Sequence, residues 1–158
     1  MSWQNWWDFG NGALGHMGSH TIDLPFWALD LDAPATVEAE GPGPAGPETY
    51  PDHLIVHWEH PARGTRPPLK FTWYDRHNRP PSPPGVDLAK WRLGIMFIGA
   101  KGILVSNYAK HLLLPEADFK GFQPPAPSIP PSPGHHLEWI EACKTGAPTS
   151  CNFDYSGA

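Results

Sequence analysis

Alternating apolar and polar residues predict several β-strands in the middle of the chain. Residues 35–40 alternate in this way, and residues 69–75 mix aromatic and apolar side chains with polar ones. The clearest signal is a hairpin, in which apolar runs at 94–99 and 103–108 flank a turn near residues 100–102. A further strand is predicted at 52–60, with Leu54, Val56 and Trp58 on one face and His53, Ile55, His57 and Glu59 on the other.

Helical patterns occur towards the two ends of the sequence. Residues 12–29 predict a helix in which Pro25 marks a kink or a break, because proline lacks the N–H group that a helix interior needs. Residues 135–145 predict a second helix, which Gly146 and Pro148 close. Strands dominate between the two helices. We therefore expect an α+β fold with a mainly antiparallel, open β-sheet and with helices packed on one face.

The stretches between these elements are rich in glycine and proline. The chain has 16 Gly and 21 Pro, and they cluster instead of spreading evenly. Clustering favours long connections over global disorder. The expected loops are 41–51 and 78–85, and residues 121–134 are expected to form a proline-spaced extended segment along the surface.

Length and composition limit the fold and its partners. A chain of 158 residues with 40% hydrophobic residues fits one domain with a real core, so we expect a single domain over 1–158. The net charge of −5 and the lack of a basic stripe argue against nucleic acid as a partner. No apolar run has membrane-spanning length and no export leader is present, so we expect no membrane partner and, by default, a cytoplasmic location. A charged fraction of only 17% favours a homo-oligomer.

The two cysteines give little guidance. Cys143 and Cys151 are not spaced as a CxxC motif, and two thiols cannot form a structural zinc site alone. A disulfide that closes a small loop and two free thiols in a reducing compartment both stay open.

A row of polar side chains stands out in the first predicted helix. His16, His20 and Asp23 occupy positions i, i+4 and i+7, which places them on one helix face about one turn apart. The surrounding segment is apolar and rich in glycine, so a random solvated face is a poor explanation. The three groups can be acid–base groups, metal ligands, or a polar seam that meets partners elsewhere in the fold.

The metal interpretation rests on the two imidazoles. Histidines at i and i+4 on a helix can chelate zinc, copper or iron. A third ligand would have to come from Asp23, His53, His57 or His136. The signal is weak, because the motif lacks the Glu that follows the first His in zinc proteases.

Several motifs resemble the C-terminal domain of Gfo/Idh/MocA oxidoreductases, which are NAD(P)-dependent enzymes that act mostly on sugars and cyclitols. The resemblance covers nearly the whole chain. The matching positions are Trp6-Trp7-Asp8-Phe9-Gly10, the glycines of 12–18, His20, Asp23, Phe71-Thr72-Trp73-Tyr74-Asp75, the hairpin 97–102, the run 132–146 and the end 150–157.

The resemblance implies a substrate-binding and oligomerisation domain without the family's N-terminal Rossmann domain. Gly10 to Gly15 does not follow a predicted strand, so it is not a dinucleotide-binding loop. We therefore expect no cofactor to be bound by this chain alone, and no hydride transfer without a nicotinamide held elsewhere. A sugar or cyclitol and a separate Rossmann-domain chain are the expected partners. Both ends look truncated relative to the family.

The resemblance also assigns roles to the polar row. The family carries Asp-x-x-x-His on this helix, and that pair assists proton transfer at the sugar carbon. His20 keeps the histidine position and is expected to act as general acid–base. His16 stands at the aspartate position, and an imidazole does not raise a neighbour's basicity as a carboxylate does, so the relay should be weakened. With Asp23, these residues form the expected catalytic set.

Aromatic and further polar residues complete the expected site. Trp7, Trp73 and Tyr74 can stack on sugar rings, although core packing competes for at least two of them. His136 is a substrate-binding candidate at the start of the second helix. Arg63 and Arg66 flank a loop, where they either bind an acidic substituent or are simply solvated.

Three functions follow from these observations. The first, which we favour, is the substrate-binding half of a sugar oxidoreductase. The second is a free-standing, metal-dependent carbohydrate-active enzyme that uses His16 and His20. The third is a non-catalytic carbohydrate-binding or oligomerisation module.

Overall fold

The chain divides into two compact units in a computed structural model that describes residues 3–157. The first unit ends at Lys120 and the second begins at Gly121. Of the aromatic N-terminal run, Met1 and Ser2 lie outside the described residues. The division does not test whether 1–158 corresponds to one family domain, so that expectation stays a prediction.

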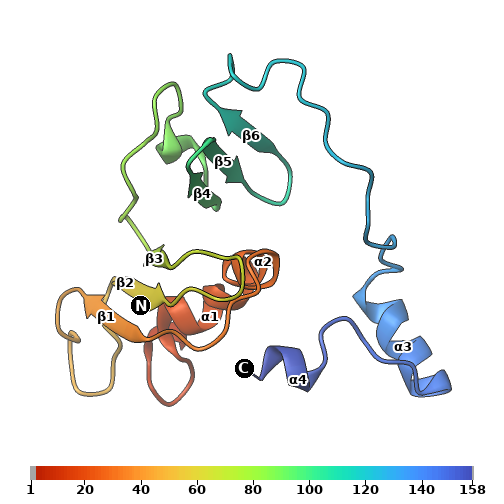
Figure 1. The fold of residues 1–158 in the computed structure, drawn as a ribbon. Helices are drawn as coiled ribbons and strands as arrows, with labels where there is room; N and C mark the ends of the chain where they lie inside the picture. The colour runs from red at the N-terminus through yellow and green to blue at the C-terminus, as the bar shows by residue number, and fades with distance from the viewer. Residues whose placement is uncertain (1–2, 158) are drawn as a thin grey trace. The chain divides into compact units, whose positions relative to one another are not determined.

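The first sheet contains β1 (Thr36–Glu40), β2 (Ile55–His60) and β3 (Leu69–Tyr74). Its strands pair antiparallel in that order, as Figure 1 shows. The predicted alternation holds along β2, where Val56 and His60 are both only 4% exposed. The strands expected at 35–40, 52–60 and 69–75 are therefore confirmed, with small shifts at their ends.

The second sheet contains β4 (Ile95–Gly99), β5 (Gly102–Ser106) and β6 (His111–Leu114), again antiparallel and in chain order. Ala100 and Lys101 form the two-residue turn of the predicted hairpin. Val105 of β5, which is 1% exposed, packs in one cluster with Leu88, Trp91 and Leu114. Leu88 belongs to a short 3₁₀ helix, η2 (Leu88–Lys90).

The first predicted helix is divided in two. α1 (Gly12–Thr21) and α2 (Asp23–Ala28) are separated at Ile22. Pro25 has no N–H to give to the carbonyl of Thr21, four residues earlier, so the helical hydrogen bonding is interrupted one turn before the proline. The expected break is thus confirmed, three residues before Pro25 itself.

A β-bridge and a hydrogen bond join the N-terminal segment to the loop that precedes β2. After the 3₁₀ helix η1 (Trp3–Asn5), Trp6 forms an isolated β-bridge with Thr49. The hydroxyl of Tyr50 donates to the carbonyl oxygen of Gly10 at 2.7 Å. These contacts fix the start of α1, the helix that carries the two candidate histidines.

The second unit begins with residues 121–134, which have no regular secondary structure apart from a turn and a bend, as expected. α3 (His135–Thr145) matches its predicted bounds and ends at Gly146, which has a left-handed φ of 74°. A short helix, α4 (Phe153–Ser156), follows. Neither helix has a buried residue, and both cysteines are exposed, free thiols.

These elements confirm the α+β class with open antiparallel sheets. The six strands form two three-stranded sheets. Within residues 3–157, no helix combines the length and the apolar character needed to span a membrane.

Candidate active-site face

His16 and His20 lie on one exposed face of α1, as their spacing predicts. Their ring centroids are 6.5 Å apart, with an angle of 51° between the ring planes. Asp23 is the first residue of α2, beyond the interruption at Ile22, and is also exposed. The three side chains do not bring their donor atoms together as a three-ligand metal site would.

Tyr108 fixes the hydrogen-bonding state of His20. Its hydroxyl donates its single proton to the backbone carbonyl oxygen of His20 at 2.8 Å, and the same oxygen lies 3.2 Å from Nδ1 of the ring. Because this proton is used, the hydroxyl can only accept a hydrogen bond from Nδ1. In the neutral ring the hydrogen is therefore on Nδ1. The lone pair on Nε2 is left without a hydrogen-bond donor from residues 3–157.

His16 has a different environment from His20. The side-chain amide nitrogen of Gln4 lies 3.2 Å from Nε2 of His16, and it can only donate to that atom. The indole ring of Trp3 meets the imidazole edge-on, with centroids 6.4 Å apart, and is itself 61% exposed. The lone pair of His16 is thus already used, whereas that of His20 is not.

The side-chain donors that do converge were not predicted as a group. Asp52, His53 and His77 each offer a ligand atom within 4.8 Å of the others, the one such group among the described residues. The metal interpretation of α1 allows His53 as a third ligand for His16 and His20, but the His53 ring lies beside that of His77 instead. The pairing of β2 with β3 could have indicated this group, because it brings residues 52–53 opposite 76–77.

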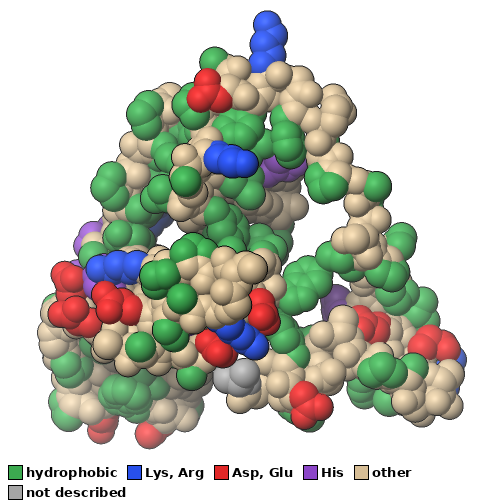
Figure 2. Space-filling model, viewed as in Figure 1, with side chains coloured by type: hydrophobic (Ala, Val, Ile, Leu, Met, Phe, Trp, Pro, Cys, Tyr) green, Lys and Arg blue, Asp and Glu red, His purple; other side chains and the backbone are tan. Residues whose placement is uncertain are grey.

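His57 is engaged within the first sheet and is not available as a metal ligand. Its Nδ1 lies 3.0 Å from Oγ1 of Thr72, and its Nε2 lies 2.9 Å from Oε1 of Glu40. Figure 2 shows acidic side chains gathered near a histidine at the side of the molecule where β1 and β2 lie. On this sheet face His57 is therefore part of a cross-strand network with Thr72 and Glu40.

A cleft of about 340 Å³ lies next to β3 in the first unit. Trp73 and Tyr74 line it from β3, and Thr21 lines it from the end of α1. Trp73 is 8% exposed, and its Nε1 is buried without a hydrogen-bond partner among the described residues. Two of the predicted stacking residues thus lie in the cleft, although Trp73 is packed too deeply to offer an open face.

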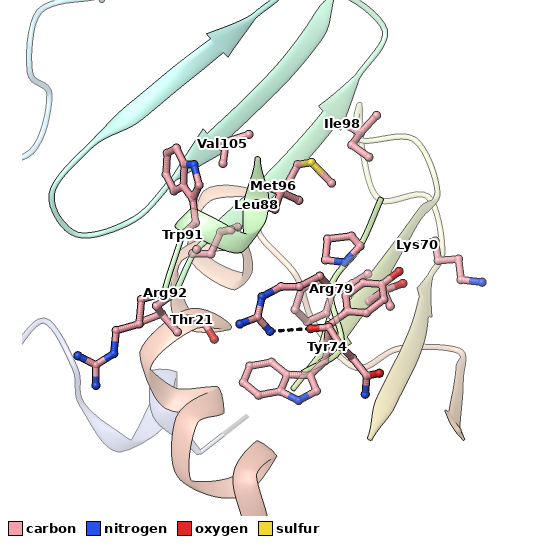
Figure 3. Close-up of a pocket in the computed structure, with 18 residues that line it drawn as sticks. Thr21, Lys70, Tyr74, Arg79, Leu88, Trp91, Arg92, Met96, Ile98 and Val105 are labelled. Carbon is pink, nitrogen blue, oxygen red and sulfur yellow. Dashed lines mark hydrogen bonds between the residues drawn. The ribbon is translucent and has the colours of Figure 1, made fainter. Parts of the chain in front are cut away.

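The charged residues that line the cleft are all basic. Lys70, Arg79 and Arg92 belong to its lining, and none of the lining residues is acidic. Figure 3 shows the guanidinium of Arg79 beside Tyr74, while the side chains of Lys70 and Arg92 point away. Arg79 donates to the carbonyl oxygen of Asn78 at 2.7 Å, so it is held at the wall of the cleft.

The remaining substrate-binding candidates are not among the residues that line the cleft. Trp7 packs against Tyr50, with centroids 3.6 Å apart, and stays 54% exposed. His136 is on α3 in the second unit, where its ring lies 4.1 Å from that of His135. In the same unit, hydrogen bonds from Ser150 hold the pKa of Glu138 below its usual range.

The side chains of the two arginines in the loop after β2 have different surroundings. Arg63 donates to the carbonyl oxygen of Asp30 at 3.0 Å and lies 3.5 Å from the carboxylates of Asp30 and Asp32. Arg66 lies near buried His60, whose pKa is lowered first by burial and then by that guanidinium. The Asp32 carboxylate acts on His60 in the opposite direction.

Comparisons with known protein families, with curated proteins and with solved structures find no match to this chain. The Gfo/Idh/MocA resemblance therefore stays a hypothesis. α1 follows η1 and an isolated bridge, not a strand with a glycine-rich turn, so its start lacks the arrangement of a dinucleotide-binding motif. The expected homo-oligomer also stays a prediction; β1 is a sheet edge whose residues are all exposed.

Proposed function

We propose that this chain is the substrate-binding part of an oxidoreductase that acts on a sugar or cyclitol, with the redox coenzyme held on a separate domain or chain. The observation that carries the proposal is the state of His20. Its Nε2 presents an exposed lone pair, and Tyr108 holds the ring by its other nitrogen.

The arrangement suits the removal of a proton from a hydroxyl group. Oxidation of a secondary alcohol to a ketone removes a hydride from carbon and a proton from oxygen. A neutral imidazole whose Nδ1–H is anchored and whose Nε2 is open can take that proton as a general base. The hydride step needs a coenzyme, which the proposal places on a separate domain or chain, so the role proposed for this chain is to bind the substrate and to accept the proton.

The side chains around His20 indicate a neutral, polyhydroxylated ligand. Gln4, His16 and Tyr108 offer amide, imidazole and phenol groups, which donate and accept hydrogen bonds without carrying a fixed charge. Trp3 adds an exposed indole next to His16, and an indole face packs well on the C–H face of a sugar ring.

His16 supports this role only in part. At this position the family carries a carboxylate, which would stabilise a protonated His20. His16 instead accepts a hydrogen bond from Gln4 and offers no negative charge. The same contact weighs against the metal-dependent alternative at His16 and His20, because the Nε2 lone pair of His16 is already in use.

Direct binding measurements test the proposal. Titration of the chain with myo-inositol and with D-glucose, followed by saturation-transfer NMR, should detect binding in the millimolar range. His20→Ala and Trp3→Ala should each weaken it by about 5- to 10-fold, the loss expected for one aromatic contact or one hydrogen bond of about 1 kcal/mol.

His111→Ala is the matched control, since His111 is an exposed histidine on β6. It should leave polyol binding unchanged. Equal binding by His20→Ala and the unmodified chain, or no binding of either polyol, would contradict the proposal.

A further inference from the structure

We propose that Asp52, His53 and His77 form a binding site for a divalent transition-metal ion of the zinc type. The site lies at the end of the β2–β3 pair, outside the His16–His20 face. It goes beyond the proposed polyol-binding function and does not rest on it.

The donor atoms are already close to the spacing that a metal requires. Nδ1 of His53 lies 3.5 Å from Oδ2 of Asp52, and the rings of His53 and His77 have centroids 4.4 Å apart at 64°. At metal–ligand distances of about 2.1 Å, two ligands of a tetrahedral ion lie about 3.4 Å apart. Because one ligand atom from each residue lies within 4.8 Å of the others, small side-chain rotations complete the site.

The backbone around these residues is held by tertiary hydrogen bonds. The carboxylate of Asp75, which is 7% exposed, accepts from the amide of Leu54 at 2.7 Å. The amide of Asp75 donates to the carbonyl oxygen of Leu54 at 3.3 Å, which extends the pairing of β2 with β3 by one residue. His53 and His77 lie just outside the strands and flank this anchored pair, which holds the backbone on both sides of the site.

The ligand atoms of the site are not engaged in hydrogen bonds with the neighbouring Arg76. The guanidinium of Arg76 is turned to Oδ1 of Asn5, at 2.8 Å, and to the backbone oxygen of Asp52, at 3.2 Å. It therefore does not occupy the Asp52 carboxylate in a hydrogen bond. Nδ1 of His53 is buried and makes no hydrogen bond to the described residues, a state that ligation of a metal would resolve.

The chemistry of the donors selects the type of ion. Two imidazoles and one carboxylate favour zinc, copper, nickel or cobalt over magnesium and calcium, which prefer oxygen ligands. Among residues 3–157 no further His, Cys, Asp or Glu joins the group. The fourth position of a tetrahedral ion is thus open to water or to an oxygen of an external ligand.

Zinc titration of the metal-free chain tests the site. The Cys143→Ser/Cys151→Ser variant is the background, because both exposed thiols can bind zinc on their own. Calorimetry with Zn²⁺ alone should show one ion per chain. Cobalt should give the visible absorption of a four-coordinate site without the near-ultraviolet band of a thiolate ligand.

His77→Ala in this background should weaken zinc binding by roughly 100-fold, because two ligands cannot hold the ion as three do. Asp52→Asn provides a second variant that keeps the shape of the side chain and should weaken binding in the same direction. His111→Ala should leave the affinity unchanged.

Three results would contradict the proposed metal site. The first is the absence of stoichiometric zinc binding. The second is equal affinity in His77→Ala, Asp52→Asn and the background. The third is loss of binding in His16→Ala/His20→Ala with retention in His77→Ala. Far-ultraviolet circular dichroism on each variant confirms that the fold is kept.

Discussion

In the first unit, the His16–His20 pair and the His53–His77 pair are assembled in opposite ways. His16 and His20 are one helical turn apart in sequence, yet their ring centroids are 6.5 Å apart. His53 lies before β2 and His77 lies after β3, and their ring centroids are only 4.4 Å apart. Closeness along a helix therefore does not ensure that side chains converge, whereas antiparallel pairing can bring distant residues into direct contact.

The difference follows from what each pair is attached to. On α1, both rings point from an exposed helix face and each is held by a different partner, Gln4 or Tyr108. At the β2–β3 end, both rings are positioned by one anchored backbone segment around Asp75. Local geometry positions the first pair for a ligand that spans several groups, and tertiary pairing positions the second for a single ion.

Asp75→Ala should have the largest effect on this comparison. The change leaves the part-buried amide of Leu54 without its acceptor, which costs about 1–3 kcal/mol of the free energy of unfolding. It should also weaken zinc binding at His53 and His77 while leaving polyol binding at His20 unchanged. Chemical denaturation and calorimetric titration of the same variant measure the three quantities.

Asp87→Ala is the control for Asp75→Ala. Its carboxylate also accepts from a backbone amide, that of Ala89 at 3.0 Å, but at an exposed 3₁₀-helix start. The cost should be about 1 kcal/mol or less, with no change in zinc affinity. Equal losses in both variants would show that Asp75 does not anchor the second histidine pair.

Much of the fold could be predicted because its signals are local. The bounds of α3 follow from its helical pattern and the left-handed Gly146, and the β4–β5 hairpin follows from two apolar runs around a short turn. β6 was missed because four residues, with a histidine at the start, carry too little periodicity. The division of the strands into two sheets was also missed, since pairing between strands is set by tertiary contacts.

The same distinction between local signals and tertiary contacts applies to the candidate sites. The shared face of His16 and His20 was predictable because helical spacing alone determines it. Tyr108 and His77 were not, since each reaches its histidine across a long stretch of sequence. A paired-strand alignment would have placed His77 near His53, but no comparable pattern links Tyr108 to the end of α1.

Tyr108→Phe should have an intermediate effect, restricted to the first histidine pair. Loss of the hydroxyl removes both contacts to His20 and should reduce polyol affinity by several-fold, as expected for about 1 kcal/mol. Nitrogen-detected NMR of the imidazoles should show His20 mainly as the Nδ1–H tautomer in the unmodified chain and as a mixture in the variant. An unchanged tautomer in Tyr108→Phe would remove the basis for assigning Nε2 of His20 as the base.

The smallest expected effect concerns His60, a histidine on β2 that belongs to neither pair. It shows how burial changes the pKa of a histidine. It is 4% exposed, and burial and the nearby Arg66 lower its pKa from the usual 6.5. The unfolded chain therefore binds a proton at this histidine more readily than the folded chain does. The resulting contribution to stability is complete above pH 6.5 and is lost as the pH falls towards the lower folded-state pKa.

His60→Gln should flatten the decrease in the free energy of unfolding between pH 7 and pH 5 in urea titrations, whereas His111→Ala should not. The same slope in His60→Gln and the unmodified chain would show that the burial of His60 does not set the acid sensitivity of the first unit.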